Sequence, residues 1–232
     1  MARVDVKTLL TAAFLTIFLF VSIYALNLFL ESKRETVISA KMNEIIEDFE
    51  EIETSSYLMD FIARRNDTYT CGIIKYQLEY LESRLWKLDQ KIKSYREVTK
   101  DFMNDAFYLQ EKKSLNRREI IHLTLLEKMK KLCNYSQTTI LYFYGKCAEN
   151  MKCDDQGFVL SYINQKIDSE IAIFSFDYDL DIPSVNALIN IYNVTEYPCV
   201  VIEEHTHCGL HNINDMETFL CSYSPSLSIC KK

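Results

Sequence analysis

Cysteine and histidine are the residue types of this sequence that are best suited to chemistry. The 232 residues include eight cysteines, and two of them, Cys147 and Cys153, are separated by five residues. A thiolate attacks a disulfide, and two thiols close into one, so such a pair serves either thiol–disulfide exchange or a structural bridge. The spacing leaves both alternatives open, as it does a third one, two separate thiols.

Three of the four histidines fall in one short segment that also holds a cysteine: His205, His207, Cys208 and His211. Imidazole and thiolate are ligands for zinc or copper. A turn is expected inside this segment, however, and it would point the side chains in different directions. An exposed polar hairpin is the preferred interpretation, a metal site is the weaker alternative, and no cofactor is predicted.

Signatures of several other enzyme classes are missing. The chain has four glycines and no glycine-rich phosphate-binding loop, no H-E-x-x-H and no G-x-S-x-G. Its formal net charge is −7, and no basic block lies beyond the residues that flank the first apolar segment. This balance argues against nucleic acid and anionic lipid surfaces as partners.

An uncharged segment, residues 9–30, follows a short N-terminal tail of residues 1–8. At about 1.5 Å per residue, a helix of this length covers the roughly 30 Å hydrocarbon core of a bilayer. A cleaved signal peptide would have a shorter apolar stretch and a small-residue cleavage site, and no such site follows here. The segment is therefore predicted to be a single-pass transmembrane anchor, with the lipid bilayer as its partner.

The orientation of the anchor rests on weaker signals. Two basic residues precede the segment and two follow it closely, so the positive-inside rule is close to a tie. An even and high number of cysteines is typical of an oxidising compartment. Three glycosylation-type triplets, which begin at Asn66, Asn134 and Asn193, add weak support for an extracytoplasmic location. We expect a cytoplasmic N-terminus and an extracytoplasmic C-terminal domain.

Residues 31–133 are predicted to form a helical stalk. In two stretches, residues 38–52 and 71–95, the apolar positions alternate spacings of three and four, as in a coiled-coil seam. A polar break at residues 65–70 suits a turn. The expected structure is an antiparallel, coiled-coil-like hairpin, and a homodimer through parallel stalks is the alternative. A third helix is expected over residues 116–132.

Residues 134–222 carry alternating elements, and residues 223–232 form a tail. Short β-branched and aromatic runs indicate strands, and stretches with one apolar side indicate helices. Asp181 is expected to cap the second helix. The elements follow in the order β-α-β-α-β-β-α, over residues 139–144, 154–166, 170–176, 182–192, 198–203, 208–211 and 214–221. This order implies parallel strands joined by helices and a terminal antiparallel hairpin.

This order, with a cysteine pair after the first strand and a proline opening the third, resembles the thioredoxin fold. The resemblance covers residues 139–220 and is carried by Leu141–Tyr144, Cys153–Gly157, Ile173–Asp179 and Tyr197–Pro198. The chain is most similar to small membrane-anchored thioredoxin-like proteins of archaea in which a helical stalk precedes the domain. The expected fold class is an α/β thioredoxin-like domain, with a mixed sheet of about four strands, preceded by a transmembrane helix and the helical hairpin.

The resemblance also implies roles for particular residues. In the family a C-x-x-C motif follows the first strand; its first thiol attacks from a helix N-terminus, and its second resolves the mixed disulfide. The proline before the third strand is cis and presents the substrate beside the sulfurs. On this basis Cys147 and Cys153 are the candidate exchanging pair for a protein thiol or disulfide partner. Tyr197 and Pro198 are the candidate substrate-positioning residues.

The sequence departs from the family pattern at the first cysteine. If Cys153 aligns with the second family cysteine, Asn150 occupies the position of the nucleophile. Cys147 takes over only if its loop folds back over the start of the helix. Two functions follow: a membrane-anchored thiol–disulfide oxidoreductase or isomerase, or a non-catalytic thioredoxin-like binding module on a helical stalk.

The remaining cysteines have simpler expectations. Cys199, directly after the proline, is either a third sulfur near the pair or a small buried residue. Cys221 and Cys230 enclose a short loop, and a disulfide that pins the C-terminal tail is expected between them. Cys71 and Cys133 have no obvious partner, because eight cysteines allow many pairings.

Overall fold

The computed structural model describes residues 7, 10–29, 54, 67–98, 104–145 and 152–231. Contacts divide the chain into two compact units, residues 1–60 and 61–232, which are described separately. The first unit contains an N-terminal apolar helix. The second contains the described strands and the helices from α2 to α6.

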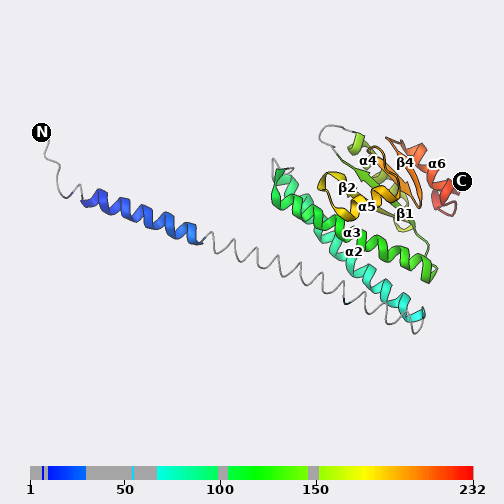
Figure 1. The fold of residues 1–232 in the computed structure, drawn as a ribbon, viewed down its shortest axis with the longest axis horizontal. Helices are drawn as coiled ribbons and strands as arrows, with labels where there is room; N and C mark the ends of the chain where they lie inside the picture. Colours follow the sequence, from blue (N-terminus) through cyan, green and yellow to red (C-terminus); the bar gives the residue numbers. More distant parts are fainter. Residues whose placement is uncertain are drawn as a thin grey trace. The chain divides into compact units, whose positions relative to one another are not determined.

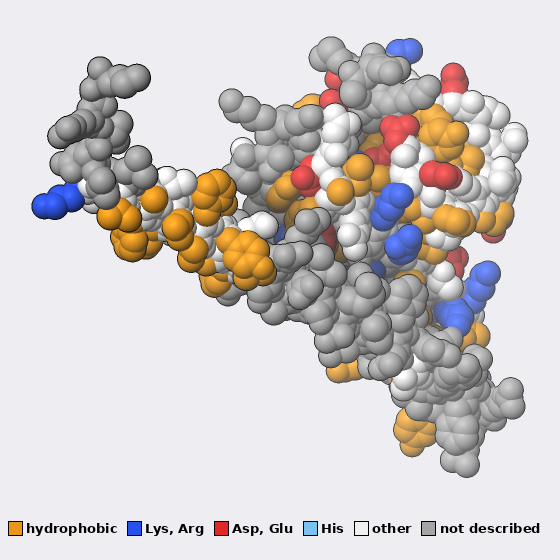
Figure 2. Space-filling model, turned by 60° about the vertical axis from the view of Figure 1, so that its left-hand side comes forward, with side chains coloured by type: hydrophobic (Ala, Val, Ile, Leu, Met, Phe, Trp, Pro, Cys, Tyr) orange, Lys and Arg blue, Asp and Glu red, His pale blue; other side chains and the backbone are white. Residues whose placement is uncertain are grey.

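The N-terminal apolar segment forms one helix over Leu10–Phe29. Its 20 residues are long and apolar enough to cross a membrane. Its large hydrophobic side chains are exposed, and Figure 2 shows them as orange surface along this helix. The helix matches the extent of the predicted anchor, residues 9–30, to within one residue at each end. The apolar stripe expected at residues 38–52 lies outside the described residues.

Two long helices, α2 (Asp67–Val98) and α3 (Ala106–Cys133), lie side by side in Figure 1. A disulfide joins Cys71 near the start of α2 to Cys133 at the end of α3. Near the other end of the pair, the Tyr95 and Phe107 rings lie 5.1 Å apart. The helices are therefore antiparallel. The buried apolar residues of α2 recur at spacings of seven and four: Ile74, Leu81, Leu88 and Ile92.

This helix pair corrects the predicted stalk in three places. The apolar stripe of α2, expected to pack on a preceding arm, packs on α3, as the cluster of Leu88, Ile92 and Tyr108 shows. The break expected at residues 65–70 is not a turn throughout, because α2 begins at Asp67. The third helix begins at Ala106 rather than at residue 116, because Asp105 caps it by accepting a hydrogen bond from the Tyr108 N–H at 2.9 Å.

The second unit contains a four-stranded sheet in the order β2-β1-β3-β4. Strand β2 is parallel to β1, β3 is antiparallel to β1, and β4 is antiparallel to β3. The strands are β1 (Thr138–Tyr144), β2 (Ile171–Asp177), β3 (Cys199–Ile202) and β4 (His205–Cys208). The mixed sheet of four strands, with helices between them, confirms the predicted α/β class.

Helices cover both faces of this sheet. They are α4 (Lys152–Ile167), α5 (Pro183–Ile191) and α6 (Ile213–Tyr223), with short 3-10 helices η2 (Asp168–Glu170), η3 (Tyr178–Leu180) and η4 (Ser228–Cys230). Successive strand residues point to opposite faces, which produces two buried clusters. One contains Leu126 of α3 and Phe174, and the other contains Ile163 of α4 and Val200. Because α3 belongs to this core, the boundary expected at residue 134 does not separate two compact units.

Two local predictions differ from the structure. The last strand begins at His205 rather than at residue 208, because the tight turn lies at residues 203–204, where Glu203 has a φ of 55°. Asp181 does not cap α5: Ile182 occupies the N-cap position without a side-chain bond. Asp181 instead accepts a hydrogen bond from Asn186 Nδ2 at 2.9 Å.

Candidate functional site

Cys153 lies in the first turn of α4, close to the carboxyl end of β1. It is not in a disulfide, and its side chain is buried. Its Sγ–H donates to the carbonyl oxygen of Gly145 at 3.4 Å. The Tyr142 hydroxyl donates to the carbonyl oxygen of Cys153 at 2.6 Å. These two bonds hold the start of α4 against the end of β1.

Gly145 separates the cysteine from a pair of stacked tyrosines. A Cβ at Gly145 would lie 3.2 Å from the Cβ of Tyr178, closer than side chains normally pack, so the position favours glycine. The ring of Tyr178 stacks on that of Tyr197, with the ring centres 5.0 Å apart. Burial, with smaller effects of Tyr178 and Asp179, raises the pKa of Tyr197 to about 12. The Tyr197 phenol therefore remains protonated at neutral pH.

The peptide bond between Tyr197 and Pro198 is cis, as the resemblance implied. Strand β3 begins directly after it with Cys199, which pairs with Phe143 of β1. Continuing this antiparallel register places Tyr197 beside Gly145. The end of β1, the start of α4 and the cis-proline therefore meet at one end of the sheet. Ligands of open α/β sheets bind in the crevice outside the carboxyl ends of the strands.

A partly buried ion pair adjoins these strand ends. Lys112 of α3 pairs with Asp177, the last residue of β2. Asp177 also accepts a hydrogen bond from the Asp179 N–H at 3.0 Å, and Lys112 Nζ lies 5.1 Å from the centre of the Tyr144 ring. Sequence reasoning singled out neither Lys112 nor Tyr178. The available signal was the position of Asp177 and Tyr178 at the end of the second predicted strand.

Cys147 and Asn150 lie outside the described residues. The pairing of Cys147 with Cys153 therefore stays a prediction. Six other cysteines form three disulfides in the described part of the chain: Cys71–Cys133, Cys199–Cys208 and Cys221–Cys230. Cys153 is thus the one described cysteine that keeps a free thiol.

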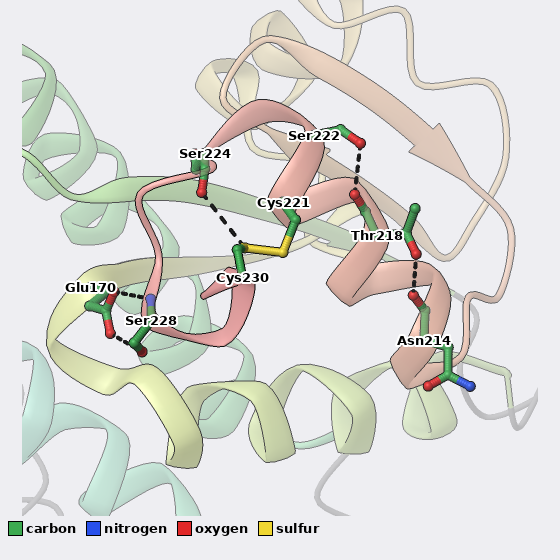
Figure 3. The surroundings of a disulfide bond; sticks show 8 residues. All are labelled: Glu170, Asn214, Thr218, Cys221, Ser222, Ser224, Ser228 and Cys230. Carbon is green, nitrogen blue, oxygen red and sulfur yellow. Dashed lines mark hydrogen bonds between the residues drawn. A yellow bond between two sulfur atoms is a disulfide. The ribbon is translucent and has the colours of Figure 1, made fainter. Parts of the chain in front are cut away.

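The Cys221–Cys230 disulfide confirms the predicted link that pins the C-terminal tail (Figure 3). It joins α6 to η4. A second link lies on the same tail in Figure 3, where the Glu170 carboxylate accepts from both the backbone N–H, at 2.8 Å, and the hydroxyl of Ser228. These bonds lower the pKa of Glu170. The tail is therefore fastened to the domain covalently and through a charged hydrogen bond.

The other two disulfides correct the sequence interpretation. Cys71 and Cys133 are partners of each other, across 62 residues of sequence. Cys199 is buried, as one of the two expectations had it, and it is bonded to Cys208 on the neighbouring strand. Cys208 is for the same reason not a thiolate ligand.

The three histidines of this segment pack on α6. His205 and His207 lie on one face of β4, where His205 stacks on Tyr223 and His207 on Phe219, each with ring centres 3.9 Å apart. His211 meets Phe219 edge-on at 5.2 Å. Burial lowers the pKa of His207, and the nearby His211 and His205 lower it further. Within the described residues, no three His, Cys, Asp or Glu side chains are grouped to hold a metal ion.

Comparison with known proteins adds little to this description. No family model matches the sequence, and none of the curated proteins matches it. One solved structure, titled "Structure of a malarial protein", is similar over 38% of this chain and 99% of its own, with 15% identity and a TM-score of 0.33. A likeness of that size supports no inference about fold or function.

Proposed function

We propose that residues 134–222 form a thioredoxin-like domain that exchanges thiols and disulfides with a protein partner through Cys147 and Cys153. The observation that carries the proposal is the state of Cys153. It keeps a buried thiol in the first turn of α4 while the other described cysteines are paired. This thiol is hydrogen-bonded to Gly145, the residue directly after β1. The cis Tyr197–Pro198 peptide lies at the same end of β1.

The proposed reaction has two steps. The Cys147 thiolate attacks a sulfur of the partner's disulfide, which forms a mixed disulfide and releases one partner thiolate. The Cys153 thiolate then attacks the Cys147 sulfur and releases the second one. The partner gains two electrons, Cys147 and Cys153 become a disulfide, and an external thiol such as glutathione restores the dithiol. Run in reverse, the same steps oxidise a partner dithiol.

We also propose that the helix Leu10–Phe29 anchors the protein in a membrane with the C-terminal domain on the extracytoplasmic side. Three disulfides among the described residues support an oxidising compartment. Asn134 and Asn193, which begin two of the glycosylation-type triplets, are exposed on the surface. The antiparallel α2–α3 pair is consistent with a coiled-coil-like stalk. Protease protection of sealed vesicles tests the orientation, because an extracytoplasmic domain resists protease added to the cytoplasmic face.

The exchange reaction is tested with the full-length protein in detergent, with glutathione as electron donor and insulin as the disulfide substrate. We expect insulin reduction above the detergent blank, and a loss of at least tenfold in Cys153→Ser and in Cys147→Ser. The paired variant Cys221→Ser/Cys230→Ser removes two cysteines outside the site and is expected to retain activity. Wild-type protein that is folded and no faster than the blank contradicts the proposal.

A non-catalytic binding module is the second candidate function. The observation in its favour is Asn150 at the family's nucleophile position, because an amide does not attack a disulfide. Mass-spectrometric mapping of the cysteines during a redox titration separates the two functions. A Cys147–Cys153 bridge that opens at mild potential favours exchange, whereas one that resists reduction below about −300 mV is structural and favours the binding module.

A further inference from the structure

A large groove runs along β2 on the side of the sheet away from β3. Its volume is about 1130 Å³, and it lies between α2 and α3 on one side and α4 on the other. Five consecutive strand residues, Ile171 to Ser175, form its floor. Side chains on the walls include Trp86 of α2, Glu119 of α3 and Ser161 of α4. The groove is separate from the site at Cys153, which does not line it.

The floor of this groove is the free edge of the sheet. β2 is the outermost strand in the order, so its outer side has no neighbouring strand among the described residues. Side chains take the place of a neighbouring strand at three backbone groups of β2. Gln137 Nε2 donates to the Ile171 carbonyl oxygen at 3.1 Å, and Asn116 Nδ2 donates to that of Ser175 at 2.9 Å. Asn116 Oδ1 also accepts from the Asp177 N–H at 3.0 Å.

These bonds identify which backbone groups face the groove. Outward and inward groups alternate along a strand, and the outward ones belong to Ile171, Ser175 and Asp177. Ile173 shares this register, so its N–H and C=O also point outward. The bonds recorded for the described residues include none that caps this pair of groups. An added strand would find there the donor and acceptor with which β-sheet pairing begins.

The walls of the groove specify the charge of its occupant. In addition to Glu119, they carry one lysine, Lys75, and four acidic residues: Glu79, Glu82, Asp89 and Asp168. Lys75 lies 4.0 Å from Glu79, and Lys93 neutralises Asp89 from outside the groove at 2.7 Å. Among the described residues, neither Glu82 nor Asp168 forms an ion pair. Trp86 adds an apolar surface that is 65% exposed.

We propose that this groove binds an extended, basic segment of a partner polypeptide, which adds as a strand to the free edge of β2. Ile173 supplies the main-chain hydrogen bonds, the acidic walls pair with Lys or Arg side chains, and Trp86 packs on an apolar one. A second copy of this chain fits poorly, since its net charge is −7 and pairing two such edges would bring acidic walls together. The proposal names the partner class for the binding-module function and does not require thiol exchange.

The test uses a synthetic probe, acetyl-Lys-Val-Thr-Val-Lys-Val-Thr-Lys-amide, and the full-length protein in detergent. Trp86 is the one tryptophan of the chain and lines the groove, so its emission reports binding directly. We expect a saturable blue shift on titration. A probe with Glu in place of Lys is expected to bind at least tenfold more weakly, as is a probe that is N-methylated at its central residues and cannot donate main-chain hydrogen bonds.

Two glycine variants localise the binding. A Cβ at Gly157, in the α4 wall, meets no atom within 4 Å, and neither does one at Gly72 on α2. Gly157→Phe places a ring in the groove and is expected to weaken the basic probe at least tenfold. Gly72→Phe makes the same change on a helix outside the groove and is expected to leave its affinity unchanged. Glu79→Gln/Glu82→Gln, on the exposed face of α2, gives a second loss of affinity.

Hydrogen exchange provides a second measurement. On addition of the basic probe, the segment 171–177 is expected to gain protection in wild type and not in Gly157→Phe. The absence of a saturable Trp86 shift up to millimolar probe overturns the proposal. Equal affinity for the N-methylated probe, or equal affinity in the two glycine variants, overturns it as well. Cys153→Ser is expected to bind the probe normally, so a failure of thiol exchange and a failure of peptide binding remain distinguishable.

Discussion

The β4 edge of the sheet is held by a covalent bond and by stacked rings, whereas the β2 edge is held by polar side chains of neighbouring elements. At the β4 edge, the Cys199–Cys208 disulfide joins the last strand to β3. His207 of the same strand stacks on Phe219 of α6. α6 is in turn fastened to the C-terminal tail by a disulfide. β4 is therefore fastened to its neighbours β3 and α6 through side chains.

At the β2 edge, Asn116 of α3 imitates the peptide group of a missing strand. Its side chain is buried, with 1% exposed, and its amide bonds to both Ser175 and Asp177. Glu119 supports it, because one carboxyl oxygen accepts from Asn116 Nδ2 at 3.0 Å and the other from the Ser175 N–H at 3.4 Å. Such contacts close an edge without a covalent bond, and they leave the neighbouring Ile173 open.

The two edges are also expected to respond to pH in opposite directions. Burial raises the pKa of Glu119 to about 8, so the folded state favours its protonated form. Burial lowers the pKa of His207, so the folded state favours its neutral form. A rise in pH therefore acts against the β2 edge, and a fall in pH acts against the β4 edge. Both edges therefore link stability to protons, with opposite signs.

The largest effect is expected from Asn116→Ala. The substitution leaves the Ser175 carbonyl and the Asp177 N–H without their partner, and each such buried group costs about 1–3 kcal/mol. We expect the free energy of unfolding to fall by about 2–4 kcal/mol, measured by denaturant titration of the full-length protein with near-UV circular dichroism. Asn164→Ala removes an exposed amide that donates to Asp168 at 3.1 Å, and is the matched control. A loss below about 0.5 kcal/mol would show that the amide does not hold this edge.

Glu119→Gln is expected to remove part of the pH dependence at the same edge. The pKa of this carboxyl is about 8 in the folded protein and 4.5 when unperturbed, so the folded state binds the extra proton between these values. Stability therefore falls as pH rises from 4.5 to 8, with a slope of at most about 1.4 kcal/mol per pH unit. Because the side chain is partly exposed, we expect the variant to gain about 1–2 kcal/mol over wild type at pH 8 and nothing at pH 4.5.

The measurement is the difference in unfolding free energy between variant and wild type at several pH values. Glu111→Gln removes a carboxylate from the same helix, in an ion pair with Lys91, and controls for the change in net charge. A Glu119→Gln profile parallel to that of wild type would contradict the assignment of this carboxyl to the edge.

The strands and helices that follow an apolar pattern were predictable from the sequence. β1 is a short, almost continuously buried run, and α4 has buried residues at helical spacing. The predicted ranges of β1, β2 and α4 differ from the observed ones by one or two residues. β4 was misplaced because His205, Thr206 and His207 show no apolar alternation, although they form a strand. This strand is held in place by the Cys199–Cys208 disulfide and by stacking on α6, and neither contact shows in the local sequence pattern.

Which elements pack against each other was not predictable in the same way. The stripe on α2 has the spacing of a seam, but that spacing does not say which helix it faces, and the structure pairs it with α3. The Cys71–Cys133 bridge follows from that pairing. At the candidate site, Cys153 and Tyr197–Pro198 were predicted from the resemblance to the thioredoxin fold. Tyr178, by contrast, is positioned by the closeness of Gly145, which no local pattern reveals.

The smallest effect is expected at the β4 edge, from His207→Phe. An aromatic ring at this position keeps the stack on Phe219, which lies 3.9 Å away, and removes the titrating group. The folded-state pKa of His207 is lowered from 6.5, by burial first and then by His211 and His205, so its contribution is complete above about pH 6.5 and is lost as pH falls below that value. Because water screens this partly exposed ring, we expect the variant to gain less than about 1 kcal/mol over wild type between pH 7 and pH 5.

The matched control is His205→Phe, which keeps the stack on Tyr223 at the exposed start of the same strand. If wild type and His207→Phe lose stability equally on acidification, the β4 edge is insensitive to protons, and the opposite pH responses of the two edges reduce to the Glu119 effect alone.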